Sequence, residues 1–198
     1  NCIVTGGKIG RCGTDGESFG GNVSMSGGRM VRCQVLNGQI GYDGHYFRAS
    51  KGAGIYANGG IIDTFLVKGN AAMYNSRCGG IYLEGTSTAV NCTVIGNTPG
   101  AYDDKVTAGV YAGSGAATIA NSVFYGNGDN SGAANFGKDN LDRFAYCASS
   151  VTNESCATWR VMDATAFKDY AESGDYRYRV NVNCRNQAIA AGRFSRAE

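Results

Sequence analysis

The chain of 198 residues has only one proline, one histidine and one tryptophan, and it has no apolar run of about 18 residues. Without such a run, the sequence predicts no membrane-spanning helix. One proline beside 31 glycines excludes a proline-rich linker or a collagen. The single histidine and the lack of any Cys-x-x-Cys pair argue against a zinc site, and no metal site is predicted.

Charge is also sparse. The 18 lysines and arginines against 16 acidic residues give a formal net charge of +2, and the basic residues are scattered. This distribution gives no support to nucleic-acid binding. The hydrophobic content of 43% is ordinary for a folded protein, and the 31 glycines favour tight turns over long helices.

A short pattern recurs along the chain at a nearly constant interval. It is clearest at 89–97, a strand-like segment that a Gly-Asn turn ends, and its counterparts lie at 1–4, 31–38, 62–70 and 120–127. The central residues of these segments are 31, 31, 28 and 30 positions apart; they are Cys2, Cys33, Thr64, Cys92 and Ser122. A repeat of this length indicates a solenoid, in which each unit stacks on the next.

Alternation along the strands separates inner from outer positions. The central residues form one predicted inner ladder, and the bulky residues two positions later form another: Val4, Val35, Leu66, Val94 and Phe124. Polar residues are expected on the wet outer face, namely Arg32, Asp63, Asn91 and Asn121. Each unit therefore contributes an apolar lumen and a polar surface.

A second set of strands lies between these segments. Its inward residues are predicted to be Val23, Ile55, Ile81 and Val110, and its outward residues Tyr56, Tyr82 and Tyr111. Two arrangements are open for the tyrosines. They form a flat aromatic strip for a glycan or a partner, or they pack beneath the long loops.

Four insertions follow the same turn of the repeat, so in a stacked coil they are expected to emerge along one side as a rim. Loops are free to carry function while the strands are committed to stacking. Aromatic rings beside carboxylates and arginine suit a sugar chain, although the tyrosines would also serve as a cover for loop backbone. The ligand-binding candidates are Tyr42, Asp43, Tyr46, Arg48, Tyr74, Arg77 and Tyr102.

The eight cysteines fit an oxidising compartment. Cys147 and Cys156 lie close together in a turn-rich segment and are predicted to form a disulfide. Cys2 and Cys33 are expected to be neighbours in one ladder, with Cα atoms about 4.8 Å apart. For this pair a disulfide and two reduced, buried thiols are both open.

The repeated Gly-Gly-Ile-Tyr (79–82) and Asn-Cys-Thr-Val-Ile-Gly-Asn (91–97) motifs resemble right-handed parallel β-helix proteins of the pectin-lyase-like superfamily. They are most similar to the bacterial secreted and surface branch with choice-of-anchor or polymorphic-outer-membrane-type repeats. The segments 162–169, 174–177 and 187–192 look like the closing coil of that branch, without its two prolines and with Ala190 in place of its aspartate. This fold carries lyases, hydrolases, adhesins and inert stalks.

Lyases of this fold typically hold Ca²⁺ with clustered carboxylates and use a basic residue. The best match is the run Asp103, Asp104 and Lys105, for which a solvated turn is the alternative. His45 is a candidate general acid or base, against a bystander loop histidine. Glycoside hydrolysis by Asp103 with Asp104, or by Asp63 with Glu84, is a further option. No cofactor is predicted, and Ca²⁺ enters only if the chain is a lyase.

The sequence thus predicts an all-β protein, a right-handed single-stranded parallel β-helix of about five to six coils. Residues 1–145 would form the coils and 146–198 a closing coil of the same domain. We expect a secreted or cell-surface module with a structural, adhesive or glycan-binding role. The alternatives are a polysaccharide lyase or hydrolase and a self-stacking fibre subunit. Because the chain opens in a strand-like segment without a signal-peptide pattern, we expect a processed protein or a fragment that stacks at its N-terminal end on further coils or another chain.

Overall fold

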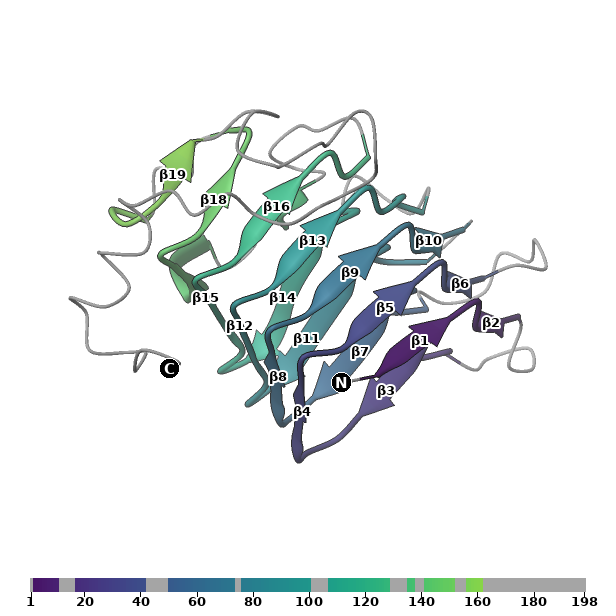
Figure 1. Ribbon diagram of the computed structural model, residues 1–198. Helices are drawn as coiled ribbons and strands as arrows, with labels where there is room; N and C mark the ends of the chain where they lie inside the picture. The colour runs from purple at the N-terminus through teal and green to yellow at the C-terminus, as the bar shows by residue number, and fades with distance from the viewer. Residues whose placement is uncertain are drawn as a thin grey trace.

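The chain forms a parallel β-solenoid. A computed structural model describes residues 2–10, 17–41, 50–73, 76–100, 107–128, 135–137, 141–151 and 156–161. Within these ranges every strand pairing is parallel, and the strands form four sheets, each named here after its first strand. Figure 1 shows the strands of each sheet stacked side by side along the solenoid. The predicted all-β fold is confirmed.

The strand bounds are as follows. The β1 sheet contains β1 (Ile3–Thr5), β5 (Gln34–Leu36), β9 (Leu66–Lys68), β13 (Thr93–Ile95), β16 (Val123–Tyr125), β18 (Ala148–Ser149) and β19 (Arg160–Val161). The β3 sheet contains β3 (Val23–Met25), β7 (Ile55–Asn58), β11 (Ile81–Gly85) and β14 (Val110–Gly115). The β4 sheet contains β4 (Arg29–Val31), β8 (Ile61–Asp63), β12 (Thr88–Val90), β15 (Thr118–Ala120) and β17 (Phe144–Ala145). The short β2 sheet contains β2 (Lys8–Ile9), β6 (Gln39–Ile40) and β10 (Ala71–Ala72), and a 3-10 turn covers Leu141–Arg143.

The number of coils is lower than expected. Three complete turns lead from β3 to β14, and the described residues before and after them supply only partial turns. The predicted five to six coils therefore exceed what the described part of the chain forms. Strands β18 and β19 continue the β1 sheet to residue 161, whereas most of the predicted closing coil, 162–198, lies outside the described residues.

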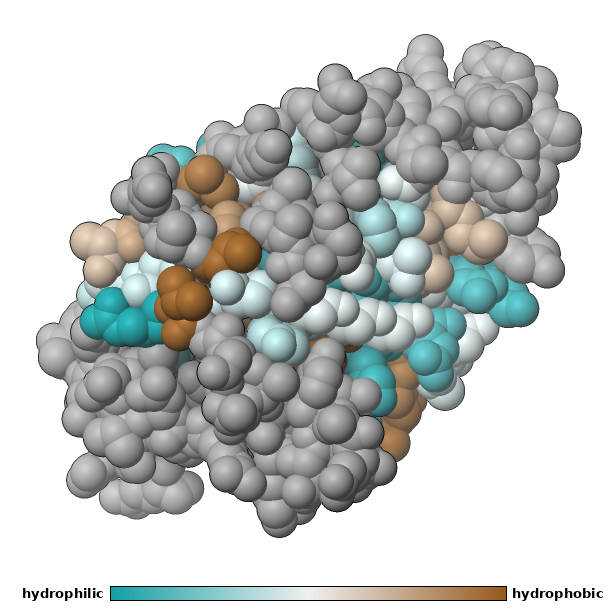
Figure 2. All heavy atoms as spheres, turned by 90° about the horizontal axis from the view of Figure 1, so that it is seen from above, coloured by the Kyte–Doolittle hydropathy of each residue, from teal (hydrophilic) through white to brown (hydrophobic). Residues whose placement is uncertain are grey.

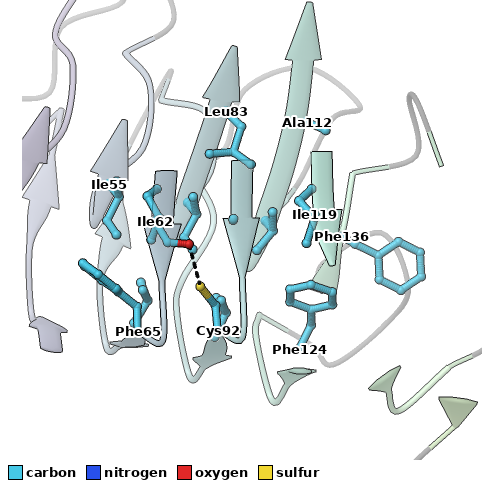
Figure 3. Packing of buried hydrophobic residues seen from close by; sticks show 14 of the residues in the cluster. Ile55, Ile62, Phe65, Leu83, Cys92, Ala112, Ile119, Phe124 and Phe136 are labelled. Atoms are coloured by element: carbon cyan, nitrogen blue, oxygen red, sulfur yellow. Dashed lines mark hydrogen bonds between the residues drawn. The ribbon is translucent and has the colours of Figure 1, made fainter. Parts of the chain in front are cut away.

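The lumen is filled by stacked aliphatic and aromatic side chains, because alternate residues of each strand point inward. Ile55, Ile81 and Val110 pair in register and are fully buried, as predicted. Figure 3 shows this packing, with Ile62 and Phe124 among the side chains that lie between the sheets. On the outside, Figure 2 shows hydrophobic residues in separate groups among hydrophilic ones.

The predicted alignment of the third repeat is wrong by one residue. Gln34 pairs with Leu66 and Leu66 with Thr93, so Phe65 rather than Thr64 stacks between Cys33 and Cys92. A shift of one residue exchanges the two faces of a strand. The inward residue that follows is therefore Val67, fully buried, and not the predicted Leu66, which lies half-buried on the outside.

Backbone conformation explains the error. The residue at the corner before β5, β9, β13, β16 and β18 adopts a left-handed conformation; these residues are Arg32, Thr64, Asn91, Asn121 and Tyr146, in that order. Thr64, with φ of 60°, is thus the equivalent of Arg32 and not of Cys33. The spacing between successive corners varies from one repeat to the next, and a search for the best residue match at a fixed period misses this variation.

A row of buried asparagine side chains runs beside the lumen. Asn70, Asn97 and Asn127 each follow a glycine with positive φ at the end of a β1-sheet strand. The Nδ2 group of Asn97 donates to Asn127 Oδ1 at 2.9 Å and to the Val67 carbonyl at 3.1 Å. Its Oδ1 accepts from the backbone N–H and from Nδ2 of Asn70. Both donors and both acceptor positions of this buried amide are therefore used.

Both ends of the asparagine ladder are completed from another part of the coil. Gly38 stands where the ladder residue would be expected, and Asn22, which precedes β3, fills its place by donating to Asn70 Oδ1 at 3.1 Å. A Cβ atom on Gly38 would lie 2.6 Å from Asn22 Nδ2, so the glycine makes room for the substitute. At the other end Asn127 Nδ2 donates to Asn135 Oδ1 at 2.9 Å.

The two ends of the lumen differ. At the C-terminal end the rings of Phe124, Phe136, Phe144 and Trp159 pack together, with centroids 4.7 Å apart for Phe136 and Trp159. The indole N–H of Trp159 donates to the Val151 carbonyl at 2.8 Å. We call these four rings the aromatic plug. At the N-terminal end the lumen residues Val23, Met25 and Met30 are only partly buried.

We predict that Asn97→Ala lowers the free energy of unfolding by about 2 to 4 kcal/mol, because it removes the buried acceptor of the Asn70 backbone N–H and the amide that donates to Asn127 and to the Val67 carbonyl. Chemical denaturation followed by circular dichroism measures the change. Asn58→Ala, which removes an exposed amide in β7, is the matched control and should change stability by less than about 0.5 kcal/mol. Equal losses in the two variants would contradict a role of the ladder in stability.

Candidate functional site

Aromatic rings stack on the outer face of the β3 sheet. Tyr56, Tyr82 and Tyr111 occupy equivalent positions of β7, β11 and β14, and their centroids are 6.2 and 5.0 Å apart. Phe19 extends the row, 4.5 Å from Tyr56. The exposed fractions of the three tyrosines are 9%, 2% and 8%, so they are packed and do not form a flat displayed strip. Their predicted outward direction is confirmed.

A charged group lies against this aromatic row. Lys51 Nζ is 3.1 Å from Glu84 Oε1 and 3.4 Å from Glu17 Oε2. The hydroxyl of Tyr56 donates to the other oxygen of Glu84 at 2.7 Å. The ammonium group also lies over the rings of Phe19 and Tyr82, with 5.5 and 5.6 Å to their centroids. We call Glu17, Lys51, Tyr56 and Glu84 the Lys51 cluster.

Stacking of the coils brings these residues together from three repeats. Bridges of the parallel type join Phe19 to Lys51 and Lys51 to Arg77, which places these three residues in one row. Glu84 pairs with Asn58 on the neighbouring strand, beyond the tyrosine row. Lys51 thus reaches across the tyrosine rings to Glu84, and the side chains of both are mostly buried.

Both hydrogen-bonded phenols are hard to ionise. Burial, the hydrogen bond to Glu84 and the charge of Glu84 raise the pKa of Tyr56 far above its ordinary value. Burial also raises the pKa of Tyr82 to about 12, and the nearby Glu84 adds to this rise, while the hydrogen bond and charge of Arg77 oppose it. Both phenols are therefore protonated at neutral pH; the Tyr56 hydroxyl donates to Glu84, and the Tyr82 oxygen accepts from Arg77.

Among the predicted ligand-binding residues, the structure describes Arg77. It is half-buried and hydrogen-bonds to Tyr82, beside the Lys51 cluster. The other predicted site residues lie outside the described residues: Tyr42, Asp43, His45, Tyr46, Arg48, Tyr74, Tyr102, Asp103, Asp104 and Lys105. The optional pair of Asp63 and Glu84 is not brought together in a shared contact, since Asp63 binds Arg29 in the β4 sheet.

The predicted disulfides are absent from the structure. Cys2 is an exposed free thiol, and Cys33, Cys147 and Cys156 are buried free thiols. The thiol of Cys33 donates to the Val31 carbonyl at 3.3 Å, and that of Cys147 donates to the Ala145 carbonyl at 3.3 Å. In both turns the sulfur is directed at the backbone two residues earlier, as is the hydroxyl of Ser122. These residues therefore serve as small turn-closing donors in the lumen.

Burial keeps the thiols of Cys92 and Cys147 protonated. It raises the pKa of Cys92 to about 12 and shifts that of Cys147 upward as well. Since thiolate is the reactive form, these cysteines are packing residues. In the described part of the chain, no three His, Cys, Asp or Glu side chains form a group suited to a metal ion. No helix within the same ranges is long and apolar enough to cross a membrane.

Sequence reasoning did not identify Phe19, Lys51 or Glu17 as site residues. They share no motif, and they meet only because residues 19, 51 and 77 fall into one row of the stack. One signal was available: Lys51 and Arg77 each follow closely on a segment in which ligand-binding residues were predicted, 42–48 and Tyr74.

The fold and the site together define a parallel β-solenoid that carries a mixed aromatic and charged cluster on one outer face. No protein-family model, no curated protein and no solved structure matches this chain.

We predict that the protein loses stability as the pH rises from about 10 to about 12, the window between the ordinary pKa of tyrosine, 10.0, and that of Tyr82. The folded chain holds the phenol proton of Tyr82 more tightly than the unfolded chain does. The stability that this proton contributes is therefore fully present below the window and is lost as the pH rises through it. Tyr82→Phe should reduce the loss, measured by chemical denaturation at a series of pH values. Tyr125→Phe, on the outer face of the β1 sheet, is the control. A wild-type curve that stays flat over the window would contradict the prediction.

Proposed function

We propose that this chain is a structural β-solenoid module that binds a glycan on the outer face of the β3 sheet, in a secreted or cell-surface setting. The observation that carries the proposal is the grouping of Lys51, Glu84 and Arg77 beside stacked tyrosine rings. Ligand sites combine apolar and aromatic surface with a few placed polar groups that fix orientation. Sugars present hydroxyl groups and apolar ring faces that suit this combination.

Accessibility favours the margin of the cluster as the contact region. The Lys51 side chain is 14% exposed, whereas Glu17 is 34% exposed and Arg77 is half-buried. A sugar would therefore meet Glu17 and Arg77 first, with Lys51 behind them. The predicted rim residues precede these positions in the chain, with Arg48 three residues before Lys51 and Tyr74 three residues before Arg77.

The structural part of the proposal follows from how the coils are held. The apolar lumen, the asparagine ladder and the aromatic plug all connect one coil to the next. A binding surface on such rigid elements is held in place with little conformational freedom. The resemblance to secreted and surface β-helix proteins of the pectin-lyase-like superfamily supports the proposed setting.

We predict that Lys51→Met and Arg77→Met each weaken glycan binding by about tenfold, as expected for the loss of one charged contact at a binding site. Affinity electrophoresis in gels that contain neutral or uronate-rich polysaccharides measures the effect, with thermal unfolding to confirm the fold. Lys68→Met removes the same charge from the β1 sheet and should leave binding unchanged. Unaltered binding in both site variants would disprove the proposed surface.

A glycoside hydrolase is the second candidate, and one distance favours it. Glu17 and Glu84 both contact Lys51 Nζ, so their contacting oxygens lie within about 6.5 Å of each other, a separation found for carboxylate pairs in glycosidases. Lys51, however, occupies the space where the sugar and its water would have to lie. Incubation with uronate-containing polysaccharides, with and without Ca²⁺, tests this candidate and the lyase through reducing ends and unsaturated products.

A further inference from the structure

The most accessible charge of the Lys51 cluster is a carboxylate. The Glu17 side chain is 34% exposed, whereas the side chains of Lys51 and Glu84 are 14% and 16% exposed. A ligand that approaches the cluster therefore meets a negative charge before it reaches the ammonium group. A carboxylate only accepts hydrogen bonds, so it suits ligand groups that donate, such as the hydroxyls of a sugar.

The ammonium group of Lys51 is already surrounded by groups of this chain. Glu84 and Glu17 lie 3.1 and 3.4 Å from its Nζ. The rings of Phe19 and Tyr82 lie beside the same atom, with their centroids at 5.5 and 5.6 Å. An anionic ligand that displaced Glu84 would leave a mostly buried carboxylate without its cation, which is costly. Lys51 is therefore poorly suited to bind an anionic sugar.

The tyrosine rings offer a sugar little surface for stacking. Tyr56, Tyr82 and Tyr111 are 9%, 2% and 8% exposed. Recognition at this face therefore falls mainly to the polar groups at its margin. Among the described residues these are the acceptor Glu17 and the donor Arg77, which is half-buried and hydrogen-bonds to Tyr82.

Building on the glycan-binding face proposed above, we infer that the site takes neutral glycans and selects against uronate-containing ones. A sugar hydroxyl both donates and accepts, so it can satisfy Glu17 and Arg77 alike. A uronate carboxylate only accepts, so it suits Arg77 but is repelled by Glu17 and Glu84. Like-charge repulsion of this kind is how binding sites reject a wrong ligand. Glu17 is therefore the residue that determines the charge class of the glycan.

The test compares polygalacturonate with its fully methyl-esterified form, because the two polymers differ in charge and share the same ring hydroxyls. Dextran and galactomannan serve as further neutral ligands. Isothermal titration calorimetry with the full chain measures each dissociation constant at low and at physiological salt. We expect the ester to bind at least about tenfold more tightly than the free acid at low salt, with a smaller difference at higher salt, where the repulsion is screened.

Glu17→Gln keeps the size of the side chain and removes its charge. It should weaken the binding of neutral glycans by about tenfold, because hydrogen bonds to a charged acceptor are the stronger ones, and it should reduce the preference for the ester. Glu17→Lys should make the free acid the tighter ligand. Asp142→Asn removes an exposed carboxylate from the 3-10 turn before β17 and is the matched control, with wild-type affinities expected. Circular dichroism and thermal unfolding verify the fold of each variant.

Two results would overturn this inference: a free acid that binds as tightly as the ester, or a Glu17→Gln variant that keeps the wild-type preference. The proposed glycan-binding face would still stand in either case, provided that Lys51→Met and Arg77→Met weaken the binding that is observed. Binding to none of the polysaccharides would overturn both the inference and the proposed function.

Discussion

Stacking of one coil directly over the next constrains almost every residue of this protein. Parallel strands in register place each side chain against the equivalent side chain of the neighbouring coils, so size and polarity must match along each row. In the lumen the matched residues are mostly aliphatic. In the ladder of Asn70, Asn97 and Asn127 they are amides, each of which donates a hydrogen bond to the asparagine of the next coil. Where the repeat supplies glycine in place of asparagine, Asn22 enters from the turn before β3 and keeps the row continuous.

The same constraint accounts for the candidate site. Rows that repeat one residue type, such as the stacked tyrosines, become buried packing. Charged side chains occur beside the rings where the residue type along a row changes from coil to coil, as in the series Phe19, Lys51 and Arg77. Lys51 then meets Glu17 and Glu84 across the rings. The unequal ends of the solenoid follow from the same principle, since the aromatic plug completes one end and nothing of the kind fills the other among the described residues.

Much of the fold could be read from periodicity. The second strand set was placed correctly, with Ile55, Ile81 and Val110 inward and the tyrosines outward, because its alternation has no insertions. The third repeat was misaligned because Thr64 occupies a left-handed corner, and nothing in its identity distinguishes a corner threonine from a stacked one. The predicted disulfides are absent for a related reason. The thiols of Cys33 and Cys147 point at the backbone carbonyl two residues earlier, and this direction depends on local backbone geometry.

By itself, the sequence determined the architecture. A repeat of about thirty residues, two-residue alternation and Gly-Asn turns are local signals that recur from one repeat to the next. Only the tertiary structure decided the exact register, the completion of the asparagine ladder by Asn22 and Asn135, and the meeting of Lys51 with Glu84. These contacts join residues from different repeats with no shared motif. The number of residues in each intervening loop sets which side chains become neighbours, and that relation exists only after the coils have stacked.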